Sequence, residues 1–236
     1  MEMKAFLIAA GEGTRLKPLT NKIPKCLIPI NGTPLLEIWL KLFEKYNVRE
    51  TLINLHHLPE YVFNYLKNYQ GQVKVTTFYE KNLLGSARTV AENRDFVKGE
   101  KAFFIIYADN LTNMNLKKMF EYHLEKGVVL TMGLFRTSTP RECGIAEINE
   151  NGIVVKFIEK PSNPQSNLAN AGIYIASEDI FNYIPNKQYA DFGYDVLPNL
   201  LSKMAGYIIE EYIIDIGLPE NYQKAQSDWK KVGINF

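Results

Sequence analysis

Two glycines and two cationic residues near the N-terminus have the types and spacing that could hold a chain of phosphates. Gly11-Glu-Gly13-Thr14-Arg15 follows a continuous apolar run over residues 4–10. Glycines let the backbone approach a ligand closely and aim successive N–H groups at phosphate oxygens. Arg15 adds a planar set of donors, and Lys25 follows ten residues later. We therefore interpret this loop as an anion-binding site.

The loop differs from the two most familiar glycine motifs. No Lys-Ser or Lys-Thr pair follows Gly13, as a Walker loop requires, and Leu16 stands where the third glycine of Gly-x-Gly-x-x-Gly belongs. A solvated glycine turn with surface cations would give the same pattern. Because Arg15 and Lys25 lie on one loop after the first predicted strand, we favour the phosphate site.

Asp109 and Asp215 are the carboxylates whose positions suit a metal ion. Each follows a predicted strand, over residues 102–107 and 207–214. Parallel strands end at the same edge of a sheet, so we expect the two carboxylates side by side, sharing one Mg²⁺ with phosphate oxygens and water. A single aspartate at a strand end is more often a turn or cap residue. The pair, together with the glycine loop, favours metal binding.

Six short segments, in order along nearly the whole chain, resemble the sugar-1-phosphate nucleotidyltransferases. They are Gly11-x-Gly13-Thr14-Arg15-Leu16 with Pro24-Lys25, Leu84-Gly85-Ser86-Ala87, Ala108-Asp109-Asn110, Phe157-Ile158-Glu159-Lys160-Pro161, Asn170-Ala171-Gly172-Ile173-Tyr174, and Ile214-Asp215-Ile216-Gly217. Each segment is a weak signal, but their order is specific. The chain looks most like the short bacterial guanylyltransferases for mannose 1-phosphate or manno-heptose 1-phosphate.

The resemblance implies an enzyme that joins a nucleoside triphosphate to a sugar 1-phosphate and releases pyrophosphate, with GTP and a manno-configured sugar as the best match. It assigns catalysis to Arg15, Lys25 and Asp109, and Mg²⁺ to Asp109 and Asp215. The implied nucleotide-binding residues are Ala10, Gly11, Gly13, Thr14, Arg15, Glu80, Gly85 and Ser86. The implied sugar-phosphate-binding residues are Asn110, Gly144, Glu159, Lys160, Asn170 and Gly172.

The sugar side depends most on Glu159 and Lys160. Lys160 would offset the charge of the sugar phosphate, and Glu159 would accept hydrogen bonds from sugar hydroxyls. A Glu-Lys pair before a proline is also a common surface pattern, and such exposed pairs are usually incidental. The resemblance decides in favour of the sugar site.

Three positions depart from the family pattern. Ala10 and Ala108 stand where the family often has glycine, which is a small change. Arg88 stands where the family's Leu-Gly-Thr-Ala-Gly segment ends in glycine, and it leaves the base and sugar preference open.

Alternating strands and helices must position these residues. Strands are predicted over 4–10, 50–55, 73–79 and 102–107, and helices over 35–46, 59–69 and 86–97. This alternation predicts an α/β fold with a Rossmann-like, mixed and mainly parallel sheet flanked by helices, which binds ligands beyond the carboxyl ends of its strands.

The second half changes character. Strands are predicted over 128–135, 144–148, 153–158 and 171–176, with Asn151-Gly152 at a hairpin turn. They would form a smaller antiparallel wall for the sugar. A helix over 195–204, a strand over 207–214 and a helix over 219–229 follow. We expect one domain over 1–236, with a nucleotide half (1–127), a sugar-phosphate half (128–236) and no C-terminal β-helix.

Composition excludes several other classes. The 236 residues are 46% apolar and 22% charged, with a net charge of +1, so no long-range field favours nucleic acid or a membrane. Two cysteines are too few for a disulfide framework, and His56-His57 has no partner at zinc-ligand spacing. The N-terminal apolar run is too short for a signal peptide or membrane span, so we expect a cytoplasmic protein. Whether it forms a homo-oligomer is open.

Three alternative functions compete with this hypothesis. A non-catalytic sensor of nucleotide sugars would have lost Arg15, Lys25 or a metal aspartate, and none is lost. A metal-dependent glycosyltransferase typically carries Asp-x-Asp, whereas this chain has Asp109-Asn-Leu. Uridylyl, thymidylyl or cytidylyl transfer to another sugar phosphate stays open, because base contacts usually come from backbone groups and loop shape.

Overall fold

The computed structural model describes residues 2–233, which form two compact units that interleave along the chain. Among the described residues, unit 1 comprises 2–83, Ile106–Met114 and 211–233, and unit 2 comprises Leu84–Ile105 and Asn115–Glu210. Packing defines these units, so the expected functional boundary at residue 127 stays a prediction.

Unit 1 contains a parallel sheet. Strand β1 (Met3–Ile8) pairs with β4 (Val48–Leu55), which pairs with β5 (Lys74–Tyr79), and the end of β6 (Phe103–Tyr107) lies beside β1. Phe6 and Leu7 in the middle of β1 are fully buried. This burial is the reason for the continuous apolar run, because a parallel strand covered on both faces needs no polar side.

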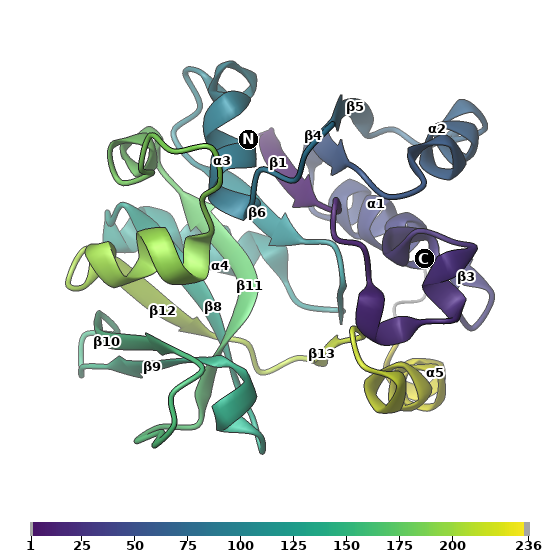
Figure 1. The fold of residues 1–236 in the computed structure, drawn as a ribbon. Helices are drawn as coiled ribbons and strands as arrows, with labels where there is room; N and C mark the ends of the chain where they lie inside the picture. The colour runs from purple at the N-terminus through teal and green to yellow at the C-terminus, as the bar shows by residue number, and fades with distance from the viewer. Residues whose placement is uncertain (1, 234–236) are drawn as a thin grey trace. The chain divides into compact units, whose positions relative to one another are not determined.

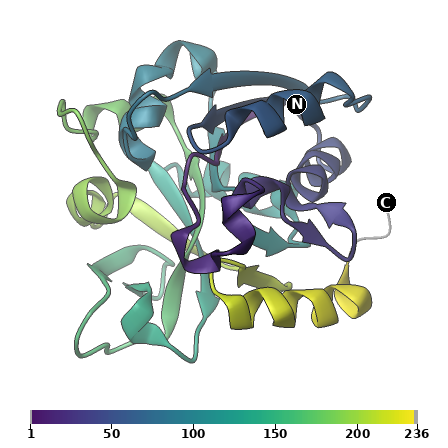
Figure 2. The same ribbon diagram turned by 45° about the vertical axis from the view of Figure 1, so that its right-hand side comes forward.

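Three helices belong to the same unit. They are α1 (Leu35–Lys45), α2 (Pro59–Lys67) and α5 (Pro219–Val232), which confirms the three predicted helices with small shifts at their ends. Helix α1 contacts β4 (Figure 1), and its Trp39 and Phe43 side chains are buried. Helix α5 lies next to the N-terminal loop region (Figure 2), and its Tyr222 and Gln226 side chains both donate to the Pro29 carbonyl.

Short elements complete unit 1. The predicted loop over residues 11–25 is wound into 3₁₀ turns at Thr14–Leu16, Leu19–Asn21 and Lys25–Leu27, followed by the small hairpin of β2 (Pro29–Ile30) and β3 (Thr33–Pro34). A separate antiparallel ladder joins β7 (Asn110–Thr112) to β13 (Ile213–Asp215).

Unit 2 contains the antiparallel strands. Strand β11 (Leu168–Ala176) pairs with β8 (Leu130–Arg136) and β9 (Gly144–Ile148), and β9 pairs with β10 (Val154–Glu159) across the predicted Asn-Gly turn. Strand β12 (Met204–Ile208) runs parallel to β8. The first residues of β6 belong to this unit, where β6 lies beside β11. The mixed sheet with flanking helices confirms the predicted fold class.

Two helices of unit 2 stand in sequence before these strands. Helix α3 (Ser86–Glu92) and a 3₁₀ turn at Arg94–Val97 replace the single predicted helix over 86–97. Helix α4 (Leu116–Lys126) was not predicted. It contacts β8, β11 and β12, and Asn115 caps its first turn by accepting from the Lys118 N–H.

Two predicted elements near residue 200 are wrong. In place of a helix over 195–204, the chain forms a π-helical turn at Phe192–Val196 and a 3₁₀ turn at Leu197–Leu200. Pro198 has no N–H to continue a helix and crowds the preceding turn. The strand predicted over 207–214 is two strands, β12 in unit 2 and β13 in unit 1.

Across residues 2–233, no helix combines the length and the apolar character that crossing a membrane requires.

Candidate active site

Four charged side chains that the sequence singled out converge in unit 1. The Lys25 ammonium lies 2.5 Å from Asp109 Oδ2 and 3.5 Å from Asp215 Oδ1. Arg15 Nη2 lies 4.0 Å from Asp215 Oδ2. The Lys25 side chain is only 10% exposed, whereas that of Arg15 is 60% exposed. The cluster therefore has a fixed inner cation and an outer cation that is free to reach a ligand.

The two aspartates meet for a different reason from the one expected. Asp109 lies in the turn between β6 and β7, and Asp215 ends β13, where it pairs with Asn110 in the antiparallel ladder. The Ile216 N–H donates to the Asp109 carbonyl at 3.0 Å. The expectation that both residues follow neighbouring parallel strands is wrong, because the strand predicted to lead to Asp215 is broken before β13.

Gly217 is a site residue to which sequence reasoning gave no role. Its N–H donates to Asp215 Oδ1 at 2.7 Å. A Cβ at this position would lie 2.7 Å from Lys25 Nζ, 2.8 Å from Asp215 Oδ1 and 3.0 Å from Arg15 Nη2. Only a glycine leaves room for the charges to meet, and its place two residues after Asp215 was the signal available in the sequence.

The charges in the cluster change the pKa values of Lys25 and Asp215. Burial by itself would lower the pKa of the Lys25 ammonium, but the Asp109 and Asp215 carboxylates outweigh it and raise that pKa. Burial and the neighbouring Asp109 charge raise the pKa of Asp215, and Lys25 partly opposes them. Two carboxylates held this close disfavour each other's ionisation, so added positive charge is favourable here.

The donor set fits a hard divalent cation. Mg²⁺ is usually held by one or two carboxylates and completed by substrate phosphates and water. Asp109 and Asp215 supply two carboxylates, and among the described residues no cluster of three or more histidines, cysteines or acids could hold a metal ion. Two facing carboxylates with an exposed edge are what such a site requires.

Hydrogen bonds to the Gly13 carbonyl hold the glycine loop in place. Gly13 has a left-handed backbone (φ 65°), and its carbonyl accepts from the Leu16 N–H and from Thr20 Oγ1, both at 2.9 Å. Position 13 requires glycine for two reasons: its backbone is left-handed, and a Cβ there would lie 2.8 Å from Thr20 Cγ2. Gly11 and Thr14 are exposed, while Ala10 is buried.

Two other predicted ligands of unit 1 turn their side chains inward. The Glu80 side chain is buried and accepts from Asn54 Nδ2 at 2.8 Å. The Asn110 side chain donates to the Tyr107 carbonyl at 3.3 Å, and Asn110 is 6% exposed. Their roles in binding stay predictions.

Unit 2 gathers a second polar cluster around the start of α3. Ser86 Oγ donates to Asp191 Oδ2 at 2.8 Å and accepts from the Phe192 N–H at 3.0 Å. The N–H groups of Ala87 and Arg88 both donate to the Ala190 carbonyl. A Cβ at Gly85 would collide with that same carbonyl. Gly85 and Ser86 thus hold the 190–192 segment closely.

Arg88, which stands where the family pattern has glycine, has a local structural role. Its guanidinium pairs with Glu92 and donates to Asn186 Oδ1 at 3.1 Å. It therefore ties α3 to the segment that leads to Asp191.

Glu159 lies among glycines. A Cβ at Gly144 would come within 2.5 Å of Glu159 Oε2, and one at Gly193 within 2.9 Å. Burial raises the pKa of the Glu159 carboxyl, the Lys160 charge lowers it and Asp191 raises it further, with a net increase. Gly193 received no role from the sequence.

Lys160 and the Asn170 bulge complete the predicted sugar-side residues. Lys160 is exposed and has a left-handed backbone (φ 49°), which is strained for a lysine and is typical of functional positions. Asn170 Nδ2 donates to the Tyr174 hydroxyl at 2.7 Å, and Asn170 Oδ1 accepts from the Gly172 N–H, within a register shift of β11. Such bulges re-aim side chains next to sites.

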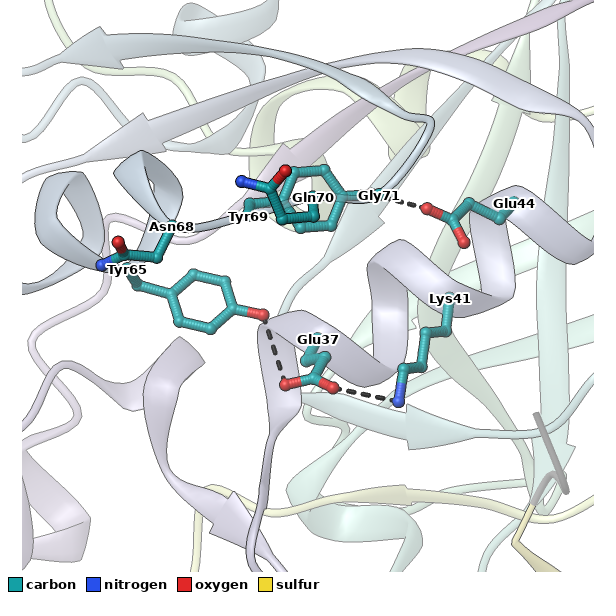
Figure 3. A pocket seen from close by; sticks show the side chains of 8 residues that line it. All are labelled: Glu37, Lys41, Glu44, Tyr65, Asn68, Tyr69, Gln70 and Gly71. Atoms are coloured by element: carbon teal, nitrogen blue, oxygen red, sulfur yellow. Dashed lines mark hydrogen bonds and ion pairs between the residues drawn. The ribbon is translucent and has the colours of Figure 1, made fainter.

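Unit 1 also has a hollow of about 360 Å³ between α1 and the end of α2 (Figure 3). The Tyr69 hydroxyl donates to Glu44 at 2.8 Å, and the Glu37 carboxylate accepts from Lys41 at 2.9 Å and from Tyr65 at 3.4 Å. Burial and these carboxylates raise the pKa of both tyrosines. The lining groups satisfy one another, so we interpret the hollow as part of the α1–α2 packing.

Known proteins share this sequence pattern and fold. The chain is 30% identical to a UTP–glucose-1-phosphate uridylyltransferase of Synechocystis, over 98% of this chain and 60% of that protein. It is 29% identical to a D-glycero-alpha-D-manno-heptose 1-phosphate guanylyltransferase of Campylobacter jejuni, over 93% of this chain and 97% of that protein.

A solved structure agrees with these relatives. HddC from Yersinia pseudotuberculosis, crystallised with GMP-PN, matches with a TM-score of 0.82 and 25% identity, over 96% of this chain and 99% of that one.

Coverage and family membership follow from the same comparisons. The chain spans about three fifths of the length of several curated relatives that it matches. The sequence profile described as "Nucleotidyl transferase" matches residues 4–232, which is nearly the whole described chain. The fold is thus that of a group of related proteins, and the chain belongs to the nucleotidyl transferase family.

Proposed function

We propose that this chain transfers the guanylyl group of GTP to a manno-configured hexose or heptose 1-phosphate, giving a GDP-sugar and pyrophosphate. The observation that carries the reaction class is the cluster of Arg15, Lys25, Asp109 and Asp215 in unit 1. Family membership supports it, since the two relatives reported above are named a uridylyltransferase and a guanylyltransferase and HddC shares the fold.

The chemistry is an in-line displacement. An oxygen of the sugar 1-phosphate attacks the α-phosphorus of the nucleotide, the bond to the oxygen bridging to the β-phosphate breaks, and pyrophosphate leaves with the electron pair. Two anions must approach each other, so the main requirement is charge compensation and orientation. The attacking phosphate is already an anion, so no covalent enzyme intermediate and no general base are needed.

Unit 1 supplies the compensation on the nucleotide side. Arg15, which is mostly exposed, would bind the β- and γ-phosphates that depart as pyrophosphate. Lys25, which is fixed between two carboxylates, would face the α-phosphate, where negative charge gathers. The N–H groups of Gly11, Gly13 and Thr14 would bind phosphate oxygens.

Asp109 and Asp215 would hold the divalent cation. Proteins of this family generally use a divalent metal, and we propose Mg²⁺. When bound, Mg²⁺ would neutralise phosphate charge next to the α-phosphorus. The role of the two carboxylates is to fix that charge in place.

Unit 2 would recognise the sugar phosphate and part of the nucleoside. Lys160 would pair with the sugar 1-phosphate, and Glu159 would accept hydrogen bonds from sugar hydroxyls. Gly85 and Ser86 would contribute backbone contacts to the nucleoside, while Asn170 and Gly172 would shape the sugar side. We place the protein in the cytoplasm, where nucleoside triphosphates are available.

The choice of GTP and a manno-configured sugar rests on the Campylobacter relative and on HddC, which match over nearly their full lengths. The uridylyltransferase of Synechocystis supports a second candidate, UTP with glucose 1-phosphate. A matrix of the four common ribonucleoside triphosphates and dTTP against glucose, mannose, N-acetylglucosamine and manno-heptose 1-phosphates, with pyrophosphate release as the readout, separates them. We expect the highest rate with GTP and a manno-configured sugar.

The same matrix identifies the other outcomes. A maximum with UTP and glucose 1-phosphate would establish the second candidate. If no pair released pyrophosphate while a nucleotide sugar bound tightly in calorimetry, the protein would be a sensor and not an enzyme.

A further inference from the structure

The end of β4 carries polar side chains that the proposed chemistry does not use. Asn54 Oδ1 accepts from the Ala9 N–H at 2.7 Å, at the point where β1 ends. Three residues further on, His57 Nε2 lies 2.8 Å from the Thr20 carbonyl oxygen. His57 thus reaches the same loop that carries Gly13.

The direction of the His57 hydrogen bond is fixed by its partner. A carbonyl oxygen has no hydrogen to give, so His57 Nε2 must carry one and donate it. The bond persists in the neutral Nε2–H tautomer and in the charged ring. His57 therefore behaves as a permanent donor to the loop.

Thr20 connects His57 to Gly13 through hydrogen bonds. Thr20 is 1% exposed, and its hydroxyl donates to the Gly13 carbonyl at 2.9 Å. A peptide unit is planar and trans, so the N–H of Thr14 points away from the Gly13 carbonyl. With the carbonyl held against buried Thr20, the Thr14 N–H is directed to the exposed side of the loop.

We propose that His57 is a positioning residue for the triphosphate loop, acting through Thr20 on the Gly13–Thr14 peptide. It touches no substrate atom and fixes the direction of a backbone N–H that would bind a phosphate oxygen. The proposal rests on the proposed function for the identity of the ligand. The ordering of the loop by His57 is independent of that function.

The first test uses steady-state kinetics with Mg²⁺ and GTP on the full chain. We expect His57→Ala to raise the KM for GTP about five- to tenfold, with kcat and the KM for the sugar phosphate changed less than about twofold, because a lost orienting bond weakens binding uniformly. His57→Gln places an amide donor near the same carbonyl and should recover most of the loss. Thr20→Val removes only the hydroxyl and should match His57→Ala.

A double variant and a control sharpen this test. Because both residues act through one chain of bonds, His57→Ala combined with Thr20→Val should raise the KM little beyond either single change. Tyr69→Phe removes two hydrogen bonds of unit 1, to Glu44 and from the Val73 N–H, and should leave the KM for GTP unchanged. Fully additive effects, or an equal rise in Tyr69→Phe, would overturn the proposal.

Limited trypsin digestion gives a readout that needs no activity. Arg15 and Lys22 are exposed and lie on the two sides of the Thr20 anchor. We expect His57→Ala and Thr20→Val to be cut there about three- to tenfold faster than wild type, with His57→Gln close to wild type, because local opening exposes the loop. If cleavage is unchanged, His57 does not order the loop. If it is faster while no nucleotide pair reacts, the positioning holds and the proposed function fails.

Discussion

The charged groups Arg15, Lys25, Asp109 and Asp215 of unit 1 lie within ion-pair distance of one another, whereas polar groups of unit 2 are hydrogen-bonded to side chains and backbone or packed against glycines. In unit 1, two cations and two carboxylates meet at a partly exposed edge. In unit 2, Ser86 and Asn170 are paired with neighbouring donors and acceptors, and Glu159 lies against Gly144.

This difference indicates two kinds of recognition. A cluster of unlike charges responds to added charge, so it suits phosphates and a metal ion. A surface of satisfied hydrogen bonds and missing Cβ atoms responds to shape, so it suits a sugar or a base. We expect substitutions in the charge cluster of unit 1 to act mainly on the rate of chemistry, and those in unit 2 mainly on substrate KM.

The largest effect should come from the two carboxylates that we propose hold Mg²⁺. Asp109→Asn and Asp215→Asn each remove a charge but keep the shape, so we expect kcat to fall by several orders of magnitude with Mg²⁺. Circular dichroism and the thermal midpoint should stay near those of wild type. Near-normal Mg²⁺-dependent activity in either variant would remove that residue from the site.

Substitutions of the two cationic residues of the cluster, Arg15 and Lys25, should have different kinetic effects. Lys25→Ala should lower kcat by about a hundredfold with a small change in the KM for the nucleotide, because Lys25 would act where charge builds up. Arg15→Ala should raise that KM and lower kcat together. Steady-state kinetics with varied nucleotide measures both. A Lys25→Ala enzyme with a normal kcat and only a raised KM would contradict the assignment.

Lys160→Ala tests the same contrast from unit 2. We expect kcat/KM for the sugar phosphate to fall about tenfold to a hundredfold, as for the loss of one charge-assisted hydrogen bond. Nucleotide binding, measured by calorimetry without the sugar, should change little. Loss of nucleotide binding with an unchanged KM for the sugar phosphate would reverse our division of roles.

A matched pair of glycine substitutions probes space in each unit. Gly217→Ala places a methyl group against Lys25 and Asp215, so we expect kcat to fall about tenfold. Gly144→Ala places one against Glu159, so we expect the KM for the sugar phosphate to rise by about the same factor. Kinetics with each substrate varied in turn distinguish the two, and identical profiles would mean that the contrast between the units is false.

The smallest effect concerns stability and not catalysis. His123 in unit 2 is buried against Thr131 Oγ1, and burial lowers its pKa to about 4. The unfolded chain binds a proton near pH 6.5 and the folded chain does not, so this contribution to stability is full above that pH and is lost as the pH falls towards 4.

Urea unfolding at pH 7 and pH 4.5 measures this contribution. We expect roughly 2 to 3 kcal/mol of the free energy of unfolding to be lost through His123, at about 1.36 kcal/mol per pKa unit. His123→Asn, which keeps an amide near Thr131, should show a correspondingly smaller loss. An equal loss in both proteins would assign the acid sensitivity to other groups.

Local sequence patterns were sufficient to predict most helices and strands. The apolar run of β1, the apolar spacing of α1 with Pro34 before it, and the Asn-Gly turn between β9 and β10 each follow from burial or turn chemistry within a few residues. Helix α4 and the turns near Pro198 were not predicted. The form of α4 depends on its contacts with β8, β11 and β12, and the form of the turns depends on one proline.

The sequence by itself determined the family and the four charged residues of unit 1, because six ordered segments and the types of Arg15, Lys25, Asp109 and Asp215 are local properties. Only the tertiary structure decided how they meet. The antiparallel β7–β13 ladder joins residues about a hundred positions apart, and no local pattern encodes that pairing. The same holds for Gly217, which clears space for Lys25, and for His57, which reaches Thr20. Contacts between distant segments depend on the packing of the whole chain, which is why residue types could predict a chemistry but not the geometry that would support it.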